Sequence, residues 1–167
     1  LNLFAYTGGA SVALAKAGAE VTHVDAAKGM VERAGENARL SGIANGIRYI
    51  VDDCKKFVAR EIRRGNKYDA IVMDPPSYGR GPGGEMWKIE TELFSFVQLC
   101  SQVLAENALF VLINSYTTGL QPTVLSNILT LTLTNERGGK VEAYEVGLPT
   151  AEGIPLPCGA GGLYINA

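Results

Sequence analysis

The sequence lacks the features of a membrane, secreted or metal-binding protein. No apolar run approaches the roughly 20 residues that a helix needs to cross a bilayer, and no basic-then-apolar leader opens the chain. Cysteine is scarce: Cys54, Cys100 and Cys158 are odd in number, far apart and without the paired spacing of a zinc site or a disulfide framework. We therefore expect a cytoplasmic protein with three reduced thiols, no membrane contact and no bound metal.

The sequence also lacks a strong charge of either sign. Its formal net charge is −2, whereas a domain that binds nucleic acid by itself usually presents a strongly basic face. If the substrate is RNA, other sequence must help to hold it. With 167 residues, 47% of them apolar and 19% charged, the chain can bury one continuous core. We expect a single domain, and the sequence leaves its oligomeric state open.

Short apolar runs alternate with longer helical patterns along most of the chain. This alternation is typical of repeated βα units and a mostly parallel sheet. The runs predict strands, and the patterns between them predict helices that mostly end at glycines. The predicted strands are 1–4, 20–24, 47–51, 68–73 and 108–114, and the predicted helices are 11–17, 26–40, 55–64 and 90–104.

The last third of the chain is less regular. Residues 122–134 open with proline, as many helices do, yet three leucines alternate with threonines there as in a strand. We favour the helix. Residues 140–146 predict a strand, and the Pro/Gly-rich stretch 147–162 predicts a long turn before a last strand at 163–166. A second glycine-rich stretch, 77–85, predicts a functional loop beside the sheet edge.

The first candidate site is the turn Ala5-Tyr6-Thr7-Gly8-Gly9-Ala10-Ser11, which follows the first run. In an open α/β sheet, ligands bind outside the carboxyl ends of the strands. The small residues of this turn leave backbone amides able to meet a polar or anionic ligand at a helix N-terminus. A plain strand-to-helix turn would use the same residues, so the turn alone does not decide between the two.

Acidic residues follow the second and third runs. Asp25 stands where nucleotide-binding βαβ units carry an acid that accepts hydrogen bonds from ribose hydroxyls. In Asp52-Asp53-Cys54, a carboxylate could accept a hydrogen bond from an adenine amino group, and the next amide could meet the ring. Each acid could also cap the helix that follows it. The sequence does not say which of the two adjacent acids faces a ligand.

Asp74-Pro75-Pro76-Ser77, directly after the fourth run, is the most specific pattern. A carboxylate followed by two prolines makes a stiff turn that lacks two backbone donors and leaves carbonyls free, which suits a planar, amine-bearing substrate. A rigid surface turn would explain the prolines but not the acid after a buried strand. Tyr78 could stack on a base or be an ordinary loop aromatic, and Trp87 could touch RNA or anchor the next helix.

These four points follow one another in the order of class I S-adenosylmethionine-dependent methyltransferases. More narrowly, residues 1–11, His23-Val24-Asp25 and Asp74-Pro75-Pro76-Ser77 resemble the bacterial large-subunit (23S) ribosomal RNA methyltransferases. Members of that group often carry an N-terminal RNA-binding PUA domain. The resemblance covers nearly the whole chain, and it implies that residues 1–167 are the methyltransferase domain. Because the chain starts with an apolar run at Leu1, we expect upstream sequence, including the RNA-binding domain, to be missing.

The resemblance implies a fold, a cofactor and a set of site residues. The fold is Rossmann-like α/β, with a seven-stranded, mostly parallel sheet, an antiparallel last strand and helices on both faces. The cofactor is S-adenosyl-L-methionine, with Tyr6, Thr7 and Gly8 at its methionine end, Asp25 at the ribose and Asp53 at the adenine. The other implied cofactor contacts are Phe4, Ala5, Gly9, Ala26, Cys54 and Asp74. The implied catalytic turn is Asp74, Pro75 and Pro76, with Ser77 and Tyr78 as acceptor contacts.

One departure from the family bears on the acceptor atom. Cytosine-C5 methyltransferases of this kind need a cysteine nucleophile, commonly just after the fifth strand, where this chain has Asn114-Ser115-Tyr116-Thr117. Cys100 lies within a helical pattern and Cys54 follows the implied adenine contact, so neither is placed for attack. Cys158, in the late turn, is the only remaining candidate. Methyl transfer to a nitrogen of a ribosomal RNA base needs no covalent intermediate and is therefore favoured.

Three other functions stay open. A nicotinamide-dependent dehydrogenase shares the βα alternation, but residues 7–11 lack the G-x-G-x-x-G spacing of that class. A non-catalytic S-adenosylmethionine-binding domain would keep the fold without turnover, and a methyltransferase of proteins or small molecules would need no basic face. We assign His23 to packing and the basic residues of 55–64 to solvated surface.

Overall fold

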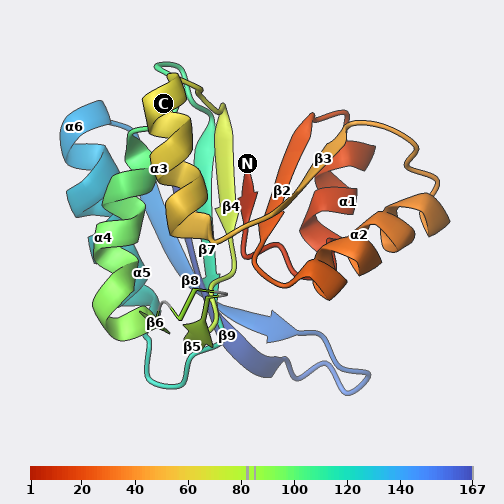
Figure 1. Ribbon diagram of the computed structural model, residues 1–167. Helices are drawn as coiled ribbons and strands as arrows, with labels where there is room; N and C mark the ends of the chain where they lie inside the picture. Colours follow the sequence, from red (N-terminus) through yellow and green to blue (C-terminus); the bar gives the residue numbers. More distant parts are fainter. Residues whose placement is uncertain (82, 85, 167) are drawn as a thin grey trace.

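The computed structural model describes residues 1–81, 83–84 and 86–166, which form one seven-stranded sheet and a small hairpin (Figure 1). The strand order is β3-β2-β1-β4-β7-β9-β8, and the first five of these strands are parallel. β9 inserts antiparallel between β7 and β8. The bounds are β1 Asn2–Leu3, β2 Val21–Asp25, β3 Ile47–Val51, β4 Ala70–Met73, β7 Phe110–Ser115, β8 Lys140–Leu148 and β9 Leu156–Ile165. The predicted Rossmann-like α/β fold with an antiparallel last strand is confirmed.

Helices cover both faces of the sheet (Figure 1). Two helices pack beside β2 and β3, namely α1 Gly9–Lys16 and α2 Lys28–Leu40. Three lie on the other face, namely α3 Cys54–Arg64, α4 Ile89–Ser101 and α5 Pro122–Leu129. The predicted strands and helices of the first 114 residues match these elements to within three residues at either end, because their apolar periodicity is strong.

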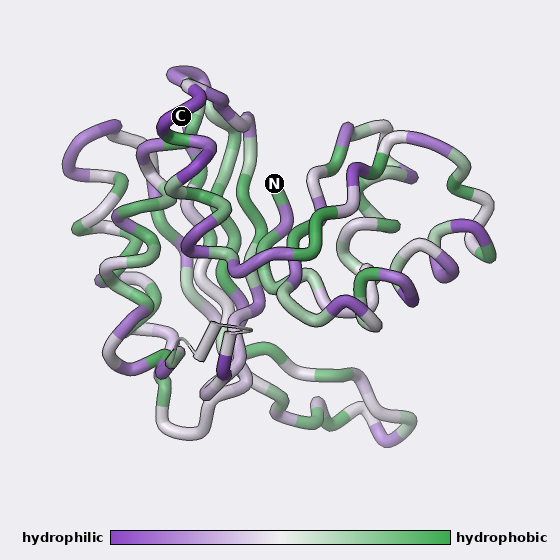
Figure 2. The backbone as a smooth tube through the Cα atoms, in the orientation of Figure 1, coloured by the Kyte–Doolittle hydropathy of each residue, from purple (hydrophilic) through white to green (hydrophobic). Residues whose placement is uncertain are grey.

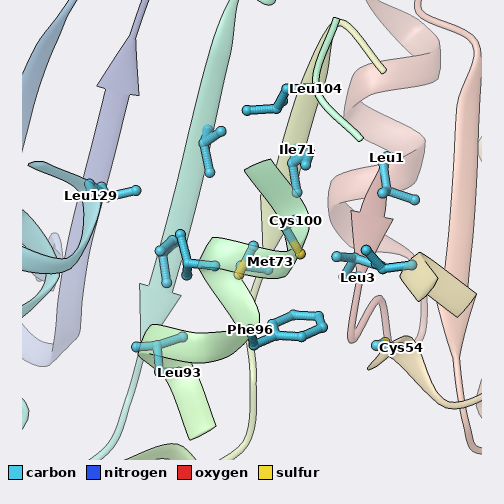
Figure 3. Close-up of a cluster of buried hydrophobic side chains, with 14 of the residues drawn as sticks. Leu1, Leu3, Cys54, Ile71, Met73, Leu93, Phe96, Cys100, Leu104 and Leu129 are labelled. Atoms are coloured by element: carbon cyan, nitrogen blue, oxygen red, sulfur yellow. The ribbon is translucent and has the colours of Figure 1, made fainter. Parts of the chain in front are cut away.

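The core lies between the sheet and the layer of helices α3, α4 and α5. Figure 3 shows Leu93, Phe96 and Cys100 of α4 close to Met73 of β4 and Leu3 of β1, and all five are at most 2% exposed. Burial of one such large apolar side chain contributes about 1.5–3 kcal/mol. Figure 2 shows mostly hydrophobic residues along the central strands, whereas hydrophobic and hydrophilic residues alternate along the helices. The core therefore holds the carboxyl ends of β1 and β4 in place.

The predicted loop over residues 77–85 is wrong in part. Tyr78–Arg80 forms β5 and Met86–Lys88 forms β6, and the two pair as an antiparallel hairpin with Gly79 opposite Trp87. Residues 82 and 85 of that loop lie outside the described residues. The glycine-rich composition predicted irregular backbone. Part of the stretch is instead a strand, because it pairs with the strand of Trp87, whose ring packs on Phe4 and Phe96.

The predicted long turn over residues 147–162 is also wrong in part. β8 continues to Leu148 and β9 already begins at Leu156, so the turn is limited to 149–155. One of the glycines inside β9, Gly162, lies where α5 packs closely on that strand. A Cβ atom at Gly162 would lie 2.8 Å from the Cβ atom of Leu125. Close helix packing, rather than a turn, therefore explains this glycine.

The helix over 122–134 is confirmed, and the strand alternative is wrong. α5 continues into a π-helical turn, η1 Thr130–Thr134, and then into α6 Asn135–Arg137. Leu129 and Leu133 are buried while Leu131 is 58% exposed, which is the periodicity of a helix face.

Neither a membrane-spanning helix nor a metal-binding cluster occurs among the described residues. No helix there has the length and apolar character needed to span a membrane. No group of three or more His, Cys, Asp or Glu side chains in the same part of the chain is arranged to hold a metal ion.

Candidate functional site

A pocket of about 670 Å³ opens at the carboxyl edge of the sheet. Its walls come from the ends of β1, β2, β4 and β7, the start of α3 and the β5–β6 hairpin. Of the residues predicted from the sequence, those that line it are Phe4, Tyr6, Asp25, Ala26, Asp53, Cys54, Asp74 and Pro76. Those that do not are Ala5, Thr7, Gly8, Gly9, Pro75, Ser77 and Tyr78. The rule that ligands bind beyond the carboxyl ends of parallel strands therefore predicted residues that share one pocket. Their contacts with a cofactor stay predictions.

The turn after β1 is strained. Phe4 and Tyr6 have φ values of 52° and 47°, in the left-handed region that non-glycine residues rarely adopt. Two bonds hold this backbone: the Tyr6 N–H donates to Asp25 Oδ2 at 2.9 Å, and the Phe4 N–H donates to Cys54 Sγ at 3.3 Å. A strained backbone of this kind persists only where the surrounding contacts hold it in place. The two strained residues, Phe4 and Tyr6, both line the pocket.

The remaining residues of that turn serve the backbone. Ala5 is buried and donates its N–H to the Val24 carbonyl, and the Thr7 carbonyl accepts from Asn37 Nδ2. Gly8 has φ 85°, and a Cβ atom there would lie 2.9 Å from the Cβ atom of Ala34. The structure thus gives Gly8 a packing reason, the close approach of α1 to α2.

Asp25 ends β2 and accepts two backbone hydrogen bonds. Its Oδ2 binds the Tyr6 N–H and its Oδ1 binds the Ala27 N–H, both at 2.9 Å. The predicted alternative that Asp25 caps the next helix is wrong, because the N-cap of α2 is Ala27. Each carboxylate oxygen keeps a second lone pair, so Asp25 can still accept hydrogen bonds from a ligand in the pocket.

The two adjacent acids after β3, Asp52 and Asp53, make different contacts. Asp52 pairs with Arg60, whereas Asp53 lines the pocket. Asp53 is also the N-cap of α3, because its Oδ1 accepts the Lys56 N–H at 2.9 Å. The Oδ2 atom of Asp53 makes no hydrogen bond to another described residue. Capping and facing the pocket therefore coexist in one carboxylate.

The turn that begins with Asp74 is tethered from two sides. Trp87 Nε1 donates to the Pro76 carbonyl at 2.7 Å, and the Ser77 hydroxyl lies 2.7 Å from the Thr117 hydroxyl. Pro75 is buried beneath the turn. The side chain of Ser77 is thus engaged with Thr117 and lies outside the pocket lining, where it was predicted to contact an acceptor.

Asp74 itself makes no side-chain hydrogen bond to another described residue. Its carboxylate reaches solvent, yet the pocket walls desolvate it enough to raise its pKa above that of an ordinary aspartate. A carboxylate with a raised pKa accepts a proton more readily than an ordinary aspartate does. Asp74 is therefore able to act both as a hydrogen-bond acceptor and as a weak base.

The β5–β6 hairpin supplies residues that the sequence did not predict for the site. Gly79, Arg80 and Gly81 line the pocket together with Trp87. The Trp87 ring packs against Phe4 at 4.9 Å and against Phe96 at 5.5 Å between ring centroids. This packing confirms the anchoring role considered for Trp87, and contact of Trp87 with RNA stays a prediction.

Two further lining residues, Ala27 and Tyr116, were also missed. Tyr116 follows β7 and is 57% exposed. Because ligands bind beyond the carboxyl ends of the strands, Tyr116 could have been predicted: it directly follows the last residue of β7. Tyr78 lies outside the lining, and its hydroxyl donates to Met86 Sδ at 3.2 Å.

The thiols are not poised for nucleophilic attack. Cys54 lines the pocket, but it is 3% exposed, and burial raises its pKa far above the usual thiol range. Cys100 is buried in the core, where its pKa is also raised. Cys158 is exposed on β9 and lies outside the pocket lining.

The remaining polar residues that the sequence singled out have structural partners. On α3, Lys55 pairs with Glu92 at 2.6 Å and Arg64 with Glu61 at 3.0 Å, and both basic side chains stay more than half exposed, as expected for a solvated surface. His23 is fully buried and hydrogen-bonded to Ser11 Oγ at 3.0 Å. Its full burial confirms the assignment of His23 to packing, and the same burial lowers its pKa.

Curated ribosomal RNA methyltransferases match part of the chain. An 80-residue stretch of the chain, 47% of it, is 38% identical to the ribosomal RNA large subunit methyltransferase I of Aeromonas hydrophila and covers 20% of that protein. A stretch of equal length is 41% identical to the ribosomal RNA large subunit methyltransferase K/L of Vibrio cholerae and covers 11% of it. These matches thus cover a fifth or less of the curated relatives.

A solved structure and a family model extend the match beyond that stretch. The crystal structure of an S-adenosylmethionine-dependent methyltransferase from Agrobacterium tumefaciens aligns with 99% of this chain and 55% of its own, with 35% identity and a TM-score of 0.92. The model of a family described as S-adenosylmethionine-dependent methyltransferase matches residues 1–119. The chain therefore belongs to the S-adenosylmethionine-dependent methyltransferases.

Proposed function

We propose that this domain transfers a methyl group from S-adenosylmethionine to a nitrogen of a ribosomal RNA base. The observation that carries the proposal is the convergence of Asp25, Asp53 and Asp74 on one pocket at the carboxyl edge of the sheet. Its volume of about 670 Å³ lies within the range of small-molecule sites, which is roughly 300–1,000 Å³. Acids at three successive strand ends suit a ligand with hydroxyls, an amino group and a reacting nitrogen.

We assign the cofactor to the side of the pocket formed by β1, β2 and α3. Asp25 accepts hydrogen bonds from the ribose hydroxyls through the lone pairs left by its two backbone donors. Asp53 accepts from the adenine amino group through Oδ2, since Oδ1 caps α3. Phe4 and Tyr6, which the strained turn directs to the pocket, enclose the methionine end.

We assign the acceptor base to the side formed by Asp74, Pro76 and Tyr116. S-adenosylmethionine supplies an electrophilic methyl group when it is bound. The protein then has to hold the acceptor nitrogen in line with that group, which is a matter of position rather than of strong acid–base catalysis. Asp74 accepts a hydrogen bond from the N–H of the acceptor and takes up the proton that the nitrogen releases. Its raised pKa favours that step.

A nitrogen acceptor agrees with the state of the thiols. Attack on C6 of a cytosine would need a thiolate at the pocket, and the only described thiol in the lining, Cys54, is held protonated by burial. The names of the relatives support ribosomal RNA as the substrate. With a net charge of −2, this domain needs the rest of the protein to hold that RNA.

The first test is calorimetry of S-adenosylhomocysteine binding to the full-length protein. Asp25→Ala is expected to weaken binding, because the ribose hydroxyls lose their acceptor. Glu106→Ala is the matched control, since Glu106 is an exposed acid outside the pocket lining. A full-length protein that binds no S-adenosylhomocysteine would contradict the cofactor assignment.

The second test is mass spectrometry of ribosomal RNA nucleosides from cells with and without the protein. One methylated nucleoside is expected to disappear, and its structure gives the base and the atom. Cells that carry only Asp74→Ala are expected to lack it too, while the purified variant keeps its affinity for S-adenosylhomocysteine. An unchanged nucleoside profile in cells without the protein would point to a protein or small-molecule acceptor, or to a domain without turnover.

A further inference from the structure

The charges around the pocket are unequal. Among the described residues that line it, three are carboxylates and only Arg80 is a cation. Arg80 forms no ion pair with any described residue, and the one hydrogen bond of its side chain to a described residue runs from Nε to the Tyr78 hydroxyl at 3.4 Å. Both terminal nitrogens of the guanidinium are therefore available to a ligand. Nearby on α3, by contrast, Lys55 and Arg60 are paired with acids of this chain.

The position of Arg80 relates it to the acceptor. It lies on β5, which directly follows the Asp74-Pro75-Pro76 turn, and it pairs across the hairpin with Met86. Gly79 packs against Pro76 on one side of β5, with 3.6 Å between a Cβ atom built on Gly79 and Pro76 Cγ. Alternation along a strand directs Tyr78 and Arg80 to the opposite side. Both are exposed there.

Two exposed aromatic side chains lie on the hairpin and the pocket wall. Tyr78 is 49% exposed and Tyr116 57% exposed, and Tyr116 lines the same pocket as Arg80. Exposed aromatics that stack bases, combined with cations that hold the backbone, are how proteins bind single-stranded RNA. A guanidinium also matches two phosphate oxygens at once.

We propose that Arg80 binds a backbone phosphate of the acceptor RNA at the mouth of the pocket, and so makes the site specific for a polynucleotide. The inference rests on the proposed function and deepens it. The cofactor has a single carboxylate as its own anion, and its methionine end is assigned to Phe4 and Tyr6. Arg80 instead belongs to the element that continues from the acceptor turn.

The test is steady-state methyl transfer by the full-length protein to ribosomal RNA from cells that lack it. Arg80→Ala is expected to raise KM for RNA roughly tenfold at low salt, because one charged hydrogen bond to the substrate is removed. The slope of log(1/KM) against log salt is expected to fall by about 0.7–1, the change that removal of a single phosphate interaction produces. Binding of S-adenosylhomocysteine is expected to stay unchanged. Arg63→Ala, an exposed arginine of α3 outside the pocket lining, is the matched control.

Other results would overturn the inference in distinguishable ways. A loss of S-adenosylhomocysteine affinity with an unchanged KM for RNA would assign Arg80 to the cofactor carboxylate. An unchanged salt slope and KM would remove Arg80 from substrate binding altogether. If the wild-type protein transferred no methyl group to ribosomal RNA, the proposed function would fail first, and Arg80 would lose its assigned ligand with it.

Discussion

The adjacent glycines at the start of α1 are expected to respond in opposite ways to the same substitution by alanine. At Gly8 the backbone has φ 85°, and a Cβ atom would lie 2.9 Å from the Ala34 Cβ and 3.3 Å from its Cα. The left-handed conformation costs an alanine about 1–2 kcal/mol, and over-packing between helices typically costs about 1–3 kcal/mol more. Gly8→Ala is therefore expected to lower the free energy of unfolding by about 2–5 kcal/mol.

Gly9 is the matched control, one residue further along. A Cβ atom there would meet nothing within 4 Å, and its φ is not positive. Gly9→Ala is expected to stabilise the fold by about 0.4–1 kcal/mol, because alanine restricts the unfolded chain. The measurement is urea unfolding followed by circular dichroism. For slopes of about 1–3 kcal/mol/M, the Gly8→Ala midpoint should fall by one to several molar relative to wild type.

The refuting result is equal behaviour of the two variants. If Gly8→Ala unfolded at the wild-type urea concentration, the close approach of α1 to α2 would be wrong. Calorimetry of Gly9→Ala adds a second reading, since Gly9 lies outside the pocket lining. If this variant were folded but bound no S-adenosylhomocysteine, the ligand would approach the Gly9 backbone, as the sequence predicted.

Two further predictions concern Trp87 and His23. Trp87→Phe keeps a ring beside Phe4 but removes the donor to the Pro76 carbonyl. We expect it to lower the free energy of unfolding by about 1 kcal/mol and to lower the single-turnover rate, while the affinity for S-adenosylhomocysteine is retained. An unchanged rate would show that the hairpin has no role in catalysis. His23, the one histidine of the chain, has a pKa below its usual 6.5 in the folded state. As the pH falls, the histidine of the unfolded chain is therefore protonated before that of the folded chain. The contribution of His23 to the free energy of unfolding is fully present above pH 6.5 and is lost as the pH drops from 6.5 towards the folded pKa. Urea unfolding at several pH values, with an NMR titration of the histidine ring, checks this, and an NMR midpoint above 6.5 would contradict it.

Much of the site was predictable because parallel strands end at one edge of the sheet. Once the apolar runs were assigned, Asp25, Asp53 and Asp74 had to lie near one another, whatever the details of packing. The choice between Asp52 and Asp53 was not predictable, since it depends on the pairing of Asp52 with Arg60.

What sequence patterns missed depends on contacts between distant residues. The hairpin lines the pocket because Trp87 packs on Phe4 and Phe96, and no local pattern encodes that contact. Gly8 was predicted to meet the cofactor, whereas its closest constraint is Ala34 on the next helix. Glycine signals a backbone need, and the sequence does not say whether a turn, a ligand or a helix creates that need.

Asp53 caps α3 with one carboxylate oxygen and faces the pocket with the same side chain. Because one side chain has both roles, few residues can replace Asp53 during evolution. Helix capping accepts asparagine, aspartate and serine about equally well, but asparagine can turn an amide donor to the ligand and serine is too short to serve both ends. Aspartate is the residue that meets both requirements, so it is expected to be retained through more divergence than its neighbour Asp52, which pairs with Arg60.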